Sequence, residues 1–202
     1  MNARAVARRM ALCCRQLAAR GLIAGRDGNL SVRLGSQRVL VTPSGYIKSL
    51  LTAADMVEVD LAGKPRSRSR RKPTSELDLH LRILRHRPDV QAVVHAHPPT
   101  ATGFAVAGQE IPSNLLPELI FVVGPVRLVP FGKPGTPELG DRLVPFLEDE
   151  RCNALLLANH GAVTMGQTLD EAWIRMESLE HSARIIVAAQ RIGQLRPLRP
   201  DG

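Results

Sequence analysis

The irregular order of strand-like and helix-like segments is the feature of this sequence that most restricts its fold. Runs with period-two alternation, such as 30–34 and 56–61, are separated by hairpin signals, loops and amphipathic stretches of unequal length. A parallel sheet built from βαβ units requires strands and helices in regular alternation, and no such rhythm is present. We therefore predict an α/β protein of the α+β type, with a central mixed, mainly antiparallel β-sheet covered by helices.

The predicted helices combine amphipathic patterns with recognisable ends. Gly21 ends the first helix, Thr74 or Ser75 caps the second, and Pro88 follows the second. The predicted helices are 2–20, 75–87, 99–106, 114–119, 137–147 and 169–192. The predicted strands are 30–34, 38–41, 56–61, 90–96, 120–123, 126–129 and 154–158.

Two histidines, His95 and His97, close an apolar strand-like run with an i, i+2 spacing. This spacing places both imidazoles on one face of a strand. His160 closes another apolar run, and Glu76 opens the second predicted helix. A lone histidine near a strand end is more often a hydrogen-bonded residue than a ligand, but three histidines and a nearby acid suit a catalytic Zn²⁺ site with an open position.

Three short segments have the small residues that let a backbone approach a phosphate. They are Gly28-Asn29, Ser44-Gly45 and Thr74-Ser75, and the last opens a helix, where the dipole favours negative charge. Lys48 could add a full positive charge. Each segment alone is also an ordinary turn or cap, so the interpretation depends on the three acting together.

The length and apolar patterning indicate one soluble domain. We predict a single domain over residues 1–196 and a flexible tail over 197–202. No apolar run approaches the roughly 18 residues that span a bilayer, and the arginine-bearing N-terminus does not resemble a signal peptide. The three cysteines show no disulfide framework and are expected to be buried apolar residues. We expect a cytoplasmic protein without membrane partners.

The net charge of +8 and the basic run 64–72 raise the question of nucleic-acid binding. Aromatic residues are only 3% of the chain, which leaves few platforms for base stacking, and no nucleic-acid-binding motif is present. We therefore predict no nucleic-acid partner. The segment Arg66–Lys72 is interpreted as a solvated loop or, next, as an attractor for a small anionic substrate.

The order of these motifs resembles the class II aldolase/adducin family from about residue 4 to 192. The motifs that carry the resemblance are Gly28-Asn29-Leu30-Ser31, Thr42-Pro43-Ser44-Gly45, Pro73-Thr74-Ser75-Glu76, His95-Ala96-His97-Pro98, Pro134-Gly135-Thr136-Pro137-Glu138-Leu139, Asn159-His160-Gly161-Ala162 and Leu179-Glu180. The resemblance is to fuculose phosphate aldolase and related deoxyketose phosphate aldolases in particular. Ribulose phosphate 4-epimerases and methylthioribulose phosphate dehydratases share the scaffold.

The resemblance implies a role for each of the candidate residues. His95, His97 and His160 would bind one Zn²⁺ per subunit, although other divalent transition metals also suit the site, and Glu76 would be the general acid/base. Gly28, Asn29, Ser44, Gly45, Thr74 and Ser75 match phosphate-binding positions. The implied reaction is reversible cleavage of a ketose 1-phosphate, such as a fuculose, 5-deoxyribulose or methylthioribulose phosphate, to dihydroxyacetone phosphate and an aldehyde through a metal-stabilised enediolate. A homotetramer with intersubunit active sites is also implied.

One departure from the family leaves alternatives open. Fuculose phosphate aldolase uses tyrosines near the leaving aldehyde, whereas Tyr46 is the only tyrosine of this chain. We propose Glu118 as a substitute acid/base donated across a subunit contact, although it could equally be a surface carboxylate. A methylthioribulose 1-phosphate dehydratase or another sugar-phosphate lyase or epimerase remains an alternative, and an adducin-like interaction module is the non-enzymatic one.

Overall fold

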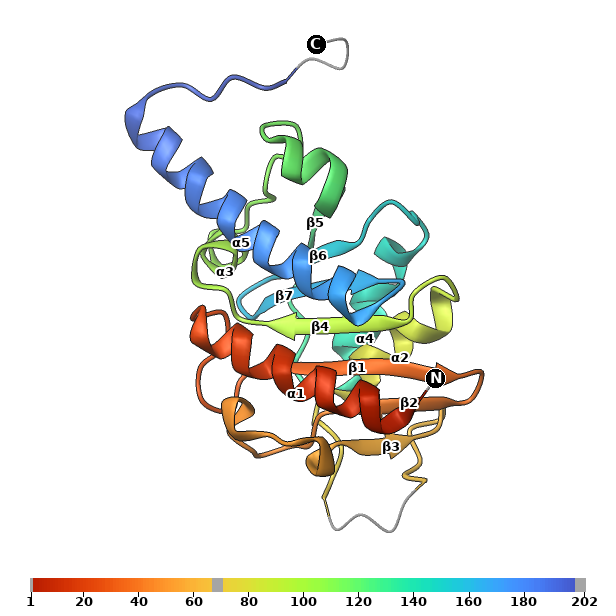
Figure 1. Cartoon of the computed structure of the whole chain (residues 1–202). Helices are drawn as coiled ribbons and strands as arrows, with labels where there is room; N and C mark the ends of the chain where they lie inside the picture. Colours follow the sequence, from red (N-terminus) through yellow and green to blue (C-terminus); the bar gives the residue numbers. More distant parts are fainter. Residues whose placement is uncertain (1, 67–70, 199–202) are drawn as a thin grey trace.

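One seven-stranded sheet organises the chain (Figure 1). The computed structural model describes residues 2–66 and 71–198. The strand order is β3-β2-β1-β4-β7-β6-β5, and every neighbouring pair is antiparallel except β5 and β6. The strands are β1 (Asn29–Gly35), β2 (Arg38–Val41), β3 (Val57–Val59), β4 (Ala92–Ala96), β5 (Val126–Val129), β6 (Ala154–Leu157) and β7 (Gly161–Gly166). The predicted fold class is confirmed.

Helices cover both faces of this sheet. The α-helices are α1 (Ala3–Ala19), α2 (Leu77–His86), α3 (Pro99–Val106), α4 (Pro137–Leu143) and α5 (Leu169–Ile192). Short 3₁₀ segments are Lys48–Leu50, Ala53–Asp55 and Val144–Leu147, and a π-helical turn, η3, spans Leu119–Val123. Figure 1 shows α1 and α5 across the near face of the sheet, with α2 and α4 behind it.

The period-two alternation of the strands separates two hydrophobic cores. In β4, Ala92, Val94 and Ala96 belong to the core that contains α1, α3 and α5, whereas Val93 belongs to the core that contains α2 and α4. Since side chains of a strand alternate between faces, His95 lies on the same face as Val93, toward α2. The sheet therefore places β4, which carries His95, under α2, the helix that begins beside Glu76.

The hairpin between β6 and β7 was only half predicted. The structure confirms a strand at β6, but the sequence analysis had no strand for β7, whose residues Gly161–Gly166 pair with both β6 and β4. The connection is a tight turn in which the His160 N–H donates to the Leu157 carbonyl at 3.0 Å. Asn159 takes a left-handed φ of 55° in this turn, a conformation that asparagine tolerates better than most residues. The glycines at both ends of β7 concealed the strand from a pattern search.

The predicted strand 120–123 is wrong, because these residues form the π-helical turn η3. Within η3 the two buried side chains are Leu119 and Val123, four residues apart, while Phe121 is 83% exposed. That spacing is helical and differs from the alternation a strand would show. A short apolar run does not distinguish the two structures by itself.

Other element boundaries differ from the prediction in smaller ways. The second helix begins at Leu77 with Glu76 at its N-cap position, so neither Thr74 nor Ser75 is the cap; Thr74 Oγ1 instead accepts the Glu76 N–H at 3.3 Å. Of the predicted helix 114–119, only the part from residue 117 onward is helical, and it leads into η3. The predicted helix 137–147 is α-helical only as far as Leu143, and its remainder is a 3₁₀ turn that contains Pro145. Residues 67–70 and 199–202 of the predicted basic loop and tail lie outside the described residues.

Two further expectations concern cysteines and membranes. Cys13, Cys14 and Cys152 are free and buried, as predicted. Burial raises the pKa of Cys14 to about 12 and that of Cys152 to about 11, so these thiols remain protonated at neutral pH. Among the described residues, no helix combines the length and the apolar character needed to cross a membrane.

Candidate metal and sugar-phosphate site

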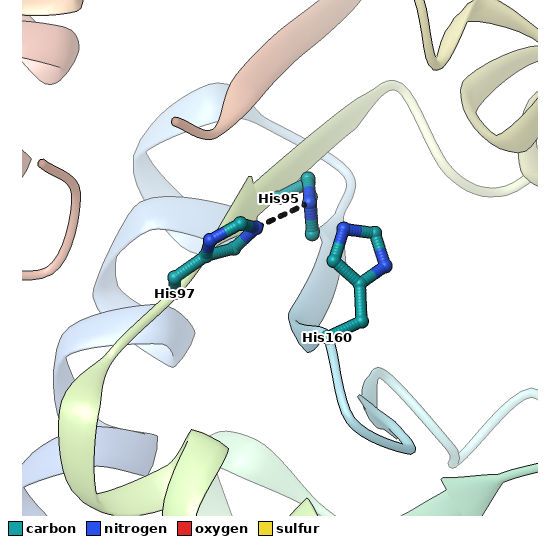
Figure 2. A group of neighbouring side chains, drawn as sticks. All are labelled: His95, His97 and His160. Atoms are coloured by element: carbon teal, nitrogen blue, oxygen red, sulfur yellow. Dashed lines mark hydrogen bonds between the residues drawn. The ribbon is translucent and has the colours of Figure 1, made fainter. Parts of the chain in front are cut away.

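The register of the sheet brings three histidines together where β4 and β7 meet. Ala96 pairs with Ala162 across these strands, so His97, one residue beyond Ala96, lies beside the turn that carries His160. His95 reaches the same place from within β4. Figure 2 shows the three imidazole rings turned toward one another, two from one strand end and one from the hairpin turn.

The ring nitrogens of these histidines are close enough to share one metal ion. One nitrogen of each ring lies within 4.8 Å of the others, and the Nε2 atoms of His95 and His97 are 3.2 Å apart (Figure 2). Two nitrogen ligands at 2.0–2.1 Å from a tetrahedral zinc ion are roughly 3.3 Å apart. The separation in this protein therefore fits two neighbouring ligands of a tetrahedral ion.

The surroundings of the rings select the nitrogens that remain available. His95 Nδ1 lies 2.9 Å from the Ala162 carbonyl oxygen, so Nδ1 is the protonated nitrogen and Nε2 carries the free lone pair. His97 Nδ1 faces the Asp27 carboxylate at 3.7 Å, which again leaves Nε2 for a ligand. Such outer contacts fix the tautomer of metal-binding histidines. Asp27 had no role in the sequence analysis, and only the folded site reveals it.

Glu76 lies directly against this cluster. Its Oε2 is 3.2 Å from His95 Nε2, and its Oε1 is 3.3 Å from His160 Nε2. Oε2 also accepts a hydrogen bond of 2.7 Å from Asn29 Nδ2. The side chain is 10% exposed, so the carboxylate is held at the edge of the histidine cluster with little access to water.

The local charges shift the pKa values of these groups in opposite directions. Burial opposes ionisation of Glu76, but His95, His160 and the hydrogen bond from Asn29 hold the pKa of this carboxyl well below its usual value. Burial and the neighbouring His95 lower the pKa of His160 to about 4. Burial also lowers the pKa of His97. Glu76 is therefore ionised, and His97 and His160 are neutral at pH 7, which is the form that binds a metal.

All six residues predicted to bind phosphate line one cavity of about 260 Å³. Gly28, Asn29, Ser44, Gly45, Thr74 and Ser75 share it with Glu76, His97 and His160. Backbone hydrogen bonds hold two of the loops side by side: Ser44 N–H donates to the Lys72 carbonyl, and Thr74 N–H donates to the Thr42 carbonyl, both at 3.0 Å. The cavity therefore brings the histidine cluster together with small residues and the N-terminus of α2.

Gly28 shows why one of these loops requires glycine. Its φ is +70°, and a Cβ at this position would lie 2.8 Å from the His95 carbonyl oxygen and 2.7 Å from Ile23 Cγ2. Any side chain would therefore push the loop away from the histidine strand. This loop and strand β4, which carries His95, are packed as one unit.

Lys48 is the buried cation of the cavity. Its Nζ donates to the Arg26 carbonyl at 2.7 Å and to the Tyr46 carbonyl at 3.1 Å, which ties together the loops before Gly28 and after Ser44. Burial lowers its pKa, an effect that the Asp27 and Glu76 carboxylates oppose. Lys48 lines the cavity and adds positive charge to it.

Two residues considered in the sequence analysis lie away from this cavity within the single chain. Glu118 is exposed at the start of η3 and does not line the cavity. Tyr46 is 41% exposed and lies under the guanidinium of Arg71, with 5.5 Å between its ring centroid and Cζ. A role for Glu118 would need a second copy of the chain.

A larger cavity, of about 810 Å³, lies beside η3 and β5. Its lining includes Phe121, Arg127 and Arg175. Arg127 lies near Glu110, and Arg175 donates to Glu171 and to the Val122 carbonyl. The described lining contains no histidine or cysteine. The chemistry is therefore assigned to the smaller cavity, which contains the metal-type ligands.

Sequence comparison places this chain among known proteins. Residues 8–187 match the family model described as Class II Aldolase and Adducin N-terminal domain. An L-fuculose phosphate aldolase of Methanococcus vannielii is 37% identical over 172 residues, which cover 85% of this chain and 90% of that protein. A 3-oxo-tetronate 4-phosphate decarboxylase of Pectobacterium atrosepticum is 36% identical over 171 residues, which cover 83% of this chain and 77% of that protein.

The fold also matches a solved structure. An L-fuculose 1-phosphate aldolase structure superposes with a TM-score of 0.88 and 31% sequence identity. The match covers 97% of this chain and 91% of that one. Both the sequence match and the structural match therefore extend over the sheet, the helices and the histidine site together.

Proposed function

Because the chain belongs to the class II aldolase and adducin N-terminal domain family, we propose that it is a metal-dependent lyase that cleaves a ketose 1-phosphate into dihydroxyacetone phosphate and an aldehyde. The proposed substrates resemble fuculose 1-phosphate or the 5-deoxyribulose and methylthioribulose phosphates. The observation that carries the proposal is the position of Glu76. Its carboxylate contacts His95 and His160 in a cavity that also contains all six predicted phosphate-binding residues.

The proposed metal is one Zn²⁺ per subunit. The donor set fits it, because three imidazoles converge and the Ala162 carbonyl, by accepting from Nδ1 of His95, leaves the Nε2 atom of that ring for a metal. When bound, the ion supplies Lewis-acid polarisation of the substrate carbonyl and stabilises the negative charge that develops there. Other divalent transition metals suit the same imidazole ligands.

Glu76 is proposed to move the proton at carbon 3. Its low pKa keeps it ionised at neutral pH, so it is proposed to take the carbon-3 proton in the condensation direction and to return that proton in cleavage, while the hydrogen bond from Asn29 fixes the carboxylate in place. A positioned acid/base contributes about 10²–10⁴-fold to a rate.

The opposite end of the cavity is proposed to bind the substrate phosphate. Ser44, Thr74 and Ser75 offer hydroxyls and backbone N–H groups there, and the N-terminus of α2 favours negative charge. Lys48 supplies the nearby positive charge. Holding the phosphate fixes the reacting carbons beside the histidines, and such positioning accounts for a large part of many enzymatic rates.

Glu118 and the quaternary structure form one connected proposal. The leaving aldehyde needs a group that takes the proton from the carbon-4 hydroxyl, and the exposed Glu118 can reach a cavity only in a neighbouring subunit. We therefore propose a homotetramer with active sites at subunit contacts. The proposed location of the enzyme is the cytoplasm, with no nucleic-acid or membrane partner.

Decarboxylation is the second candidate, and the decarboxylase relative favours it. Loss of CO₂ from a 3-oxo acid 4-phosphate leaves the same three-carbon enediolate as aldol cleavage does. The leaving CO₂ carries no proton, so this reaction needs no base at that end of the substrate. The absence of a tyrosine or Glu118 from the described lining of the cavity fits such a reaction.

Product analysis separates these reactions. The metal-loaded protein is given fuculose, 5-deoxyribulose and methylthioribulose 1-phosphates and a 3-oxo-tetronate 4-phosphate, and dihydroxyacetone phosphate is coupled to NADH oxidation. An aldehyde with no CO₂ supports the aldolase, and CO₂ release supports the decarboxylase. Loss of water with all carbons retained would instead indicate a dehydratase, and inversion without cleavage an epimerase. A metal-bound protein that is inert to the whole panel would favour the interaction module.

The role of Glu76 has a separate test. Glu76→Gln should keep its metal content and lose about 10²–10⁴-fold in turnover, because the amide cannot accept the proton. The exposed Glu148→Gln is the matched control and should retain full activity. His95→Ala should lose metal and turnover together. An active Glu76→Gln variant would refute the acid/base assignment.

A further inference from the structure

A fully buried histidine, His80, lies behind the cavity and has no role in the proposed chemistry so far. It stands one helical turn after Glu76 in α2, and its side chain is 0% exposed. Both ring nitrogens are paired: Nδ1 lies 2.7 Å from Ser31 Oγ, and Nε2 lies 2.5 Å from Asn29 Oδ1. Asn29 in turn holds Glu76.

The sheet register explains this arrangement. Asn29 and Ser31 are two residues apart in β1, so both point to the face of the sheet that α2 covers. Asn29 pairs directly with His95 of the neighbouring strand. The hydrogen bonds therefore pass back and forth between β1 and α2, from Ser31 to His80 to Asn29 to Glu76.

The orientation of the Asn29 amide determines the direction of the bonds in this chain. Asn29 Nδ2 donates to Glu76 Oε2, so Oδ1, which can only accept, is the atom that faces His80. His80 must then donate from Nε2, which leaves Nδ1 as an acceptor. The Ser31 hydroxyl donates to that nitrogen. One tautomer of His80 alone satisfies all three bonds.

We propose that His80 is a positioning residue that fixes the Asn29 amide and, through it, the Glu76 carboxylate. This inference rests on the proposed function for its effect on turnover. Asn29 also lines the cavity, and Glu76 is the only acceptor of its amide N–H groups among the described residues. The same orientation therefore leaves the second amide N–H for the substrate phosphate. Fixing the amide sets both the acid/base and one phosphate donor.

The buried position of His80 supports this role. Burial, with a smaller contribution from His95, lowers the pKa of His80 to about 3, so the ring stays neutral over the range in which the enzyme would work. Ser31, His80 and Asn29 are each at most 4% exposed, so water does not compete for these bonds. A flipped Asn29 amide would place two acceptors, Oδ1 and the Glu76 carboxylate, against each other.

The tautomer provides a test that does not depend on activity. Long-range ¹H–¹⁵N NMR of the imidazole nitrogens in the full-length protein should show His80 as the neutral Nε2–H form at pH 7. Ser31→Ala removes only the donor to Nδ1 and should introduce a measurable fraction of the Nδ1–H form. A wild-type His80 that is protonated on Nδ1 would overturn the proposal, even if no substrate of the enzyme had been found.

Turnover then tests the positioning effect. His80→Phe keeps an aromatic ring without the donor and should lower kcat by about 10–100-fold, with a smaller change in KM and an unchanged metal content. His80→Gln restores an N–H near the Nε2 position and should recover most of the loss. An unchanged kcat in His80→Phe, or equal losses in both variants, would contradict the role even when the wild type cleaves its substrate as proposed.

A double-mutant cycle separates positioning from general packing. If His80 acts through Asn29, the His80→Phe change should cost little further turnover in an Asn29→Ala background. Two independent structural effects would instead multiply. A double variant whose fold-loss in kcat equals the product of the two single losses would therefore refute the coupling. If the wild type shows no activity but His80 shows the expected NMR result, only the proposed function is refuted.

Discussion

Replacing Gly161 by alanine should damage the proposed metal site without changing any of its three histidines. Gly161 is the first residue of β7, next to His160, and a Cβ there would lie 2.6 Å from both the Ala96 carbonyl oxygen and His97 Cδ2. It would also lie 3.3 Å from His95 Cε1. Ordinary contacts of this kind begin at 3.4 Å, so the neighbours must retreat by the difference between 2.6 and 3.4 Å, about 0.8 Å.

A movement of this size exceeds what the site can absorb. Metal-ligand distances hold to within about 0.2 Å, and functional groups need placement to about 0.5 Å. One of the two clashing atoms is backbone, in the strand that is paired with β7, so rotation of a side chain cannot relieve the overlap. We expect Gly161→Ala to weaken zinc binding by about 10–100-fold, the range found when the surroundings of ligands are disturbed. Overpacking should also lower the free energy of unfolding by about 1–3 kcal/mol.

The assay is zinc affinity by competition with a chelator, with urea unfolding measured on the same samples. Gly103→Ala is the matched control, because Gly103 lies in α3, which begins two residues after His97, and has no atom within 4 Å of its Cβ position. That change should leave the zinc affinity unaltered and raise helix stability by about 0.5–1 kcal/mol. A Gly161→Ala protein that binds zinc as tightly as the wild type would show that the geometric argument is wrong.

The remaining predictions concern stability. Arg87→Leu should lower the free energy of unfolding by about 3–5 kcal/mol in urea titrations, because the 2%-exposed guanidinium pairs with Asp89 and donates to several carbonyls; an unchanged unfolding midpoint would contradict this. The hydrogen bond from Arg87 holds the pKa of Asp89 below its unfolded value. The ionised Asp89 carboxylate therefore stabilises the folded protein above about pH 4, and this stabilisation is lost as the pH falls through the lower folded pKa. The difference in unfolding free energy between the wild type and Asp89→Asn should narrow below about pH 4 and stay constant above it. Glu180→Ala should cost about 1–2 kcal/mol, because this carboxylate accepts the Thr100 and Ala101 N–H groups at the start of α3, and Glu148→Ala should cost nothing measurable. Zinc at 100 times its Kd should stabilise the folded protein by about 2.7 kcal/mol, and chelator should remove that gain; equal melting temperatures with and without zinc would mean that no folded-state site exists.

Glu180 illustrates how the fold supports the site at a distance. Pro98 stands at the N-cap position of α3 and makes no side-chain cap hydrogen bond. The carboxylate of Glu180, from the middle of α5, accepts those N–H groups instead and also pairs with Arg184. Since α3 begins two residues after His97, this contact from α5 also holds the segment that follows β4 and carries His97.

Local sequence determined the elements that have strong periodicity or clear ends. The long helix α5 and the first helix were predicted nearly to the residue, because a 3.6-residue pattern and a terminating glycine act within a few residues of each other. The strand 120–123 failed, and β7 was missed, because short apolar or glycine-bounded runs take their structure from their neighbours. The i, i+2 spacing of His95 and His97 correctly indicated that the two rings lie close together, since a strand has only two faces.

Only the tertiary structure decided which distant residues complete the site. His160 approaches the other two histidines because β7 pairs with β4 in one particular register, and a shift of one residue would turn its neighbours to the opposite face. Asp27 and Lys48 gained their contacts from loops that meet through pairing of residues far apart in the sequence. His80 carries no motif of its own, yet burial of α2 against β1 pairs its two ring nitrogens with Ser31 and Asn29. The sequence specifies which side chains are available. Which of them become hydrogen-bond partners, and how far apart the histidine nitrogens lie, depends on distances that only the packed sheet sets.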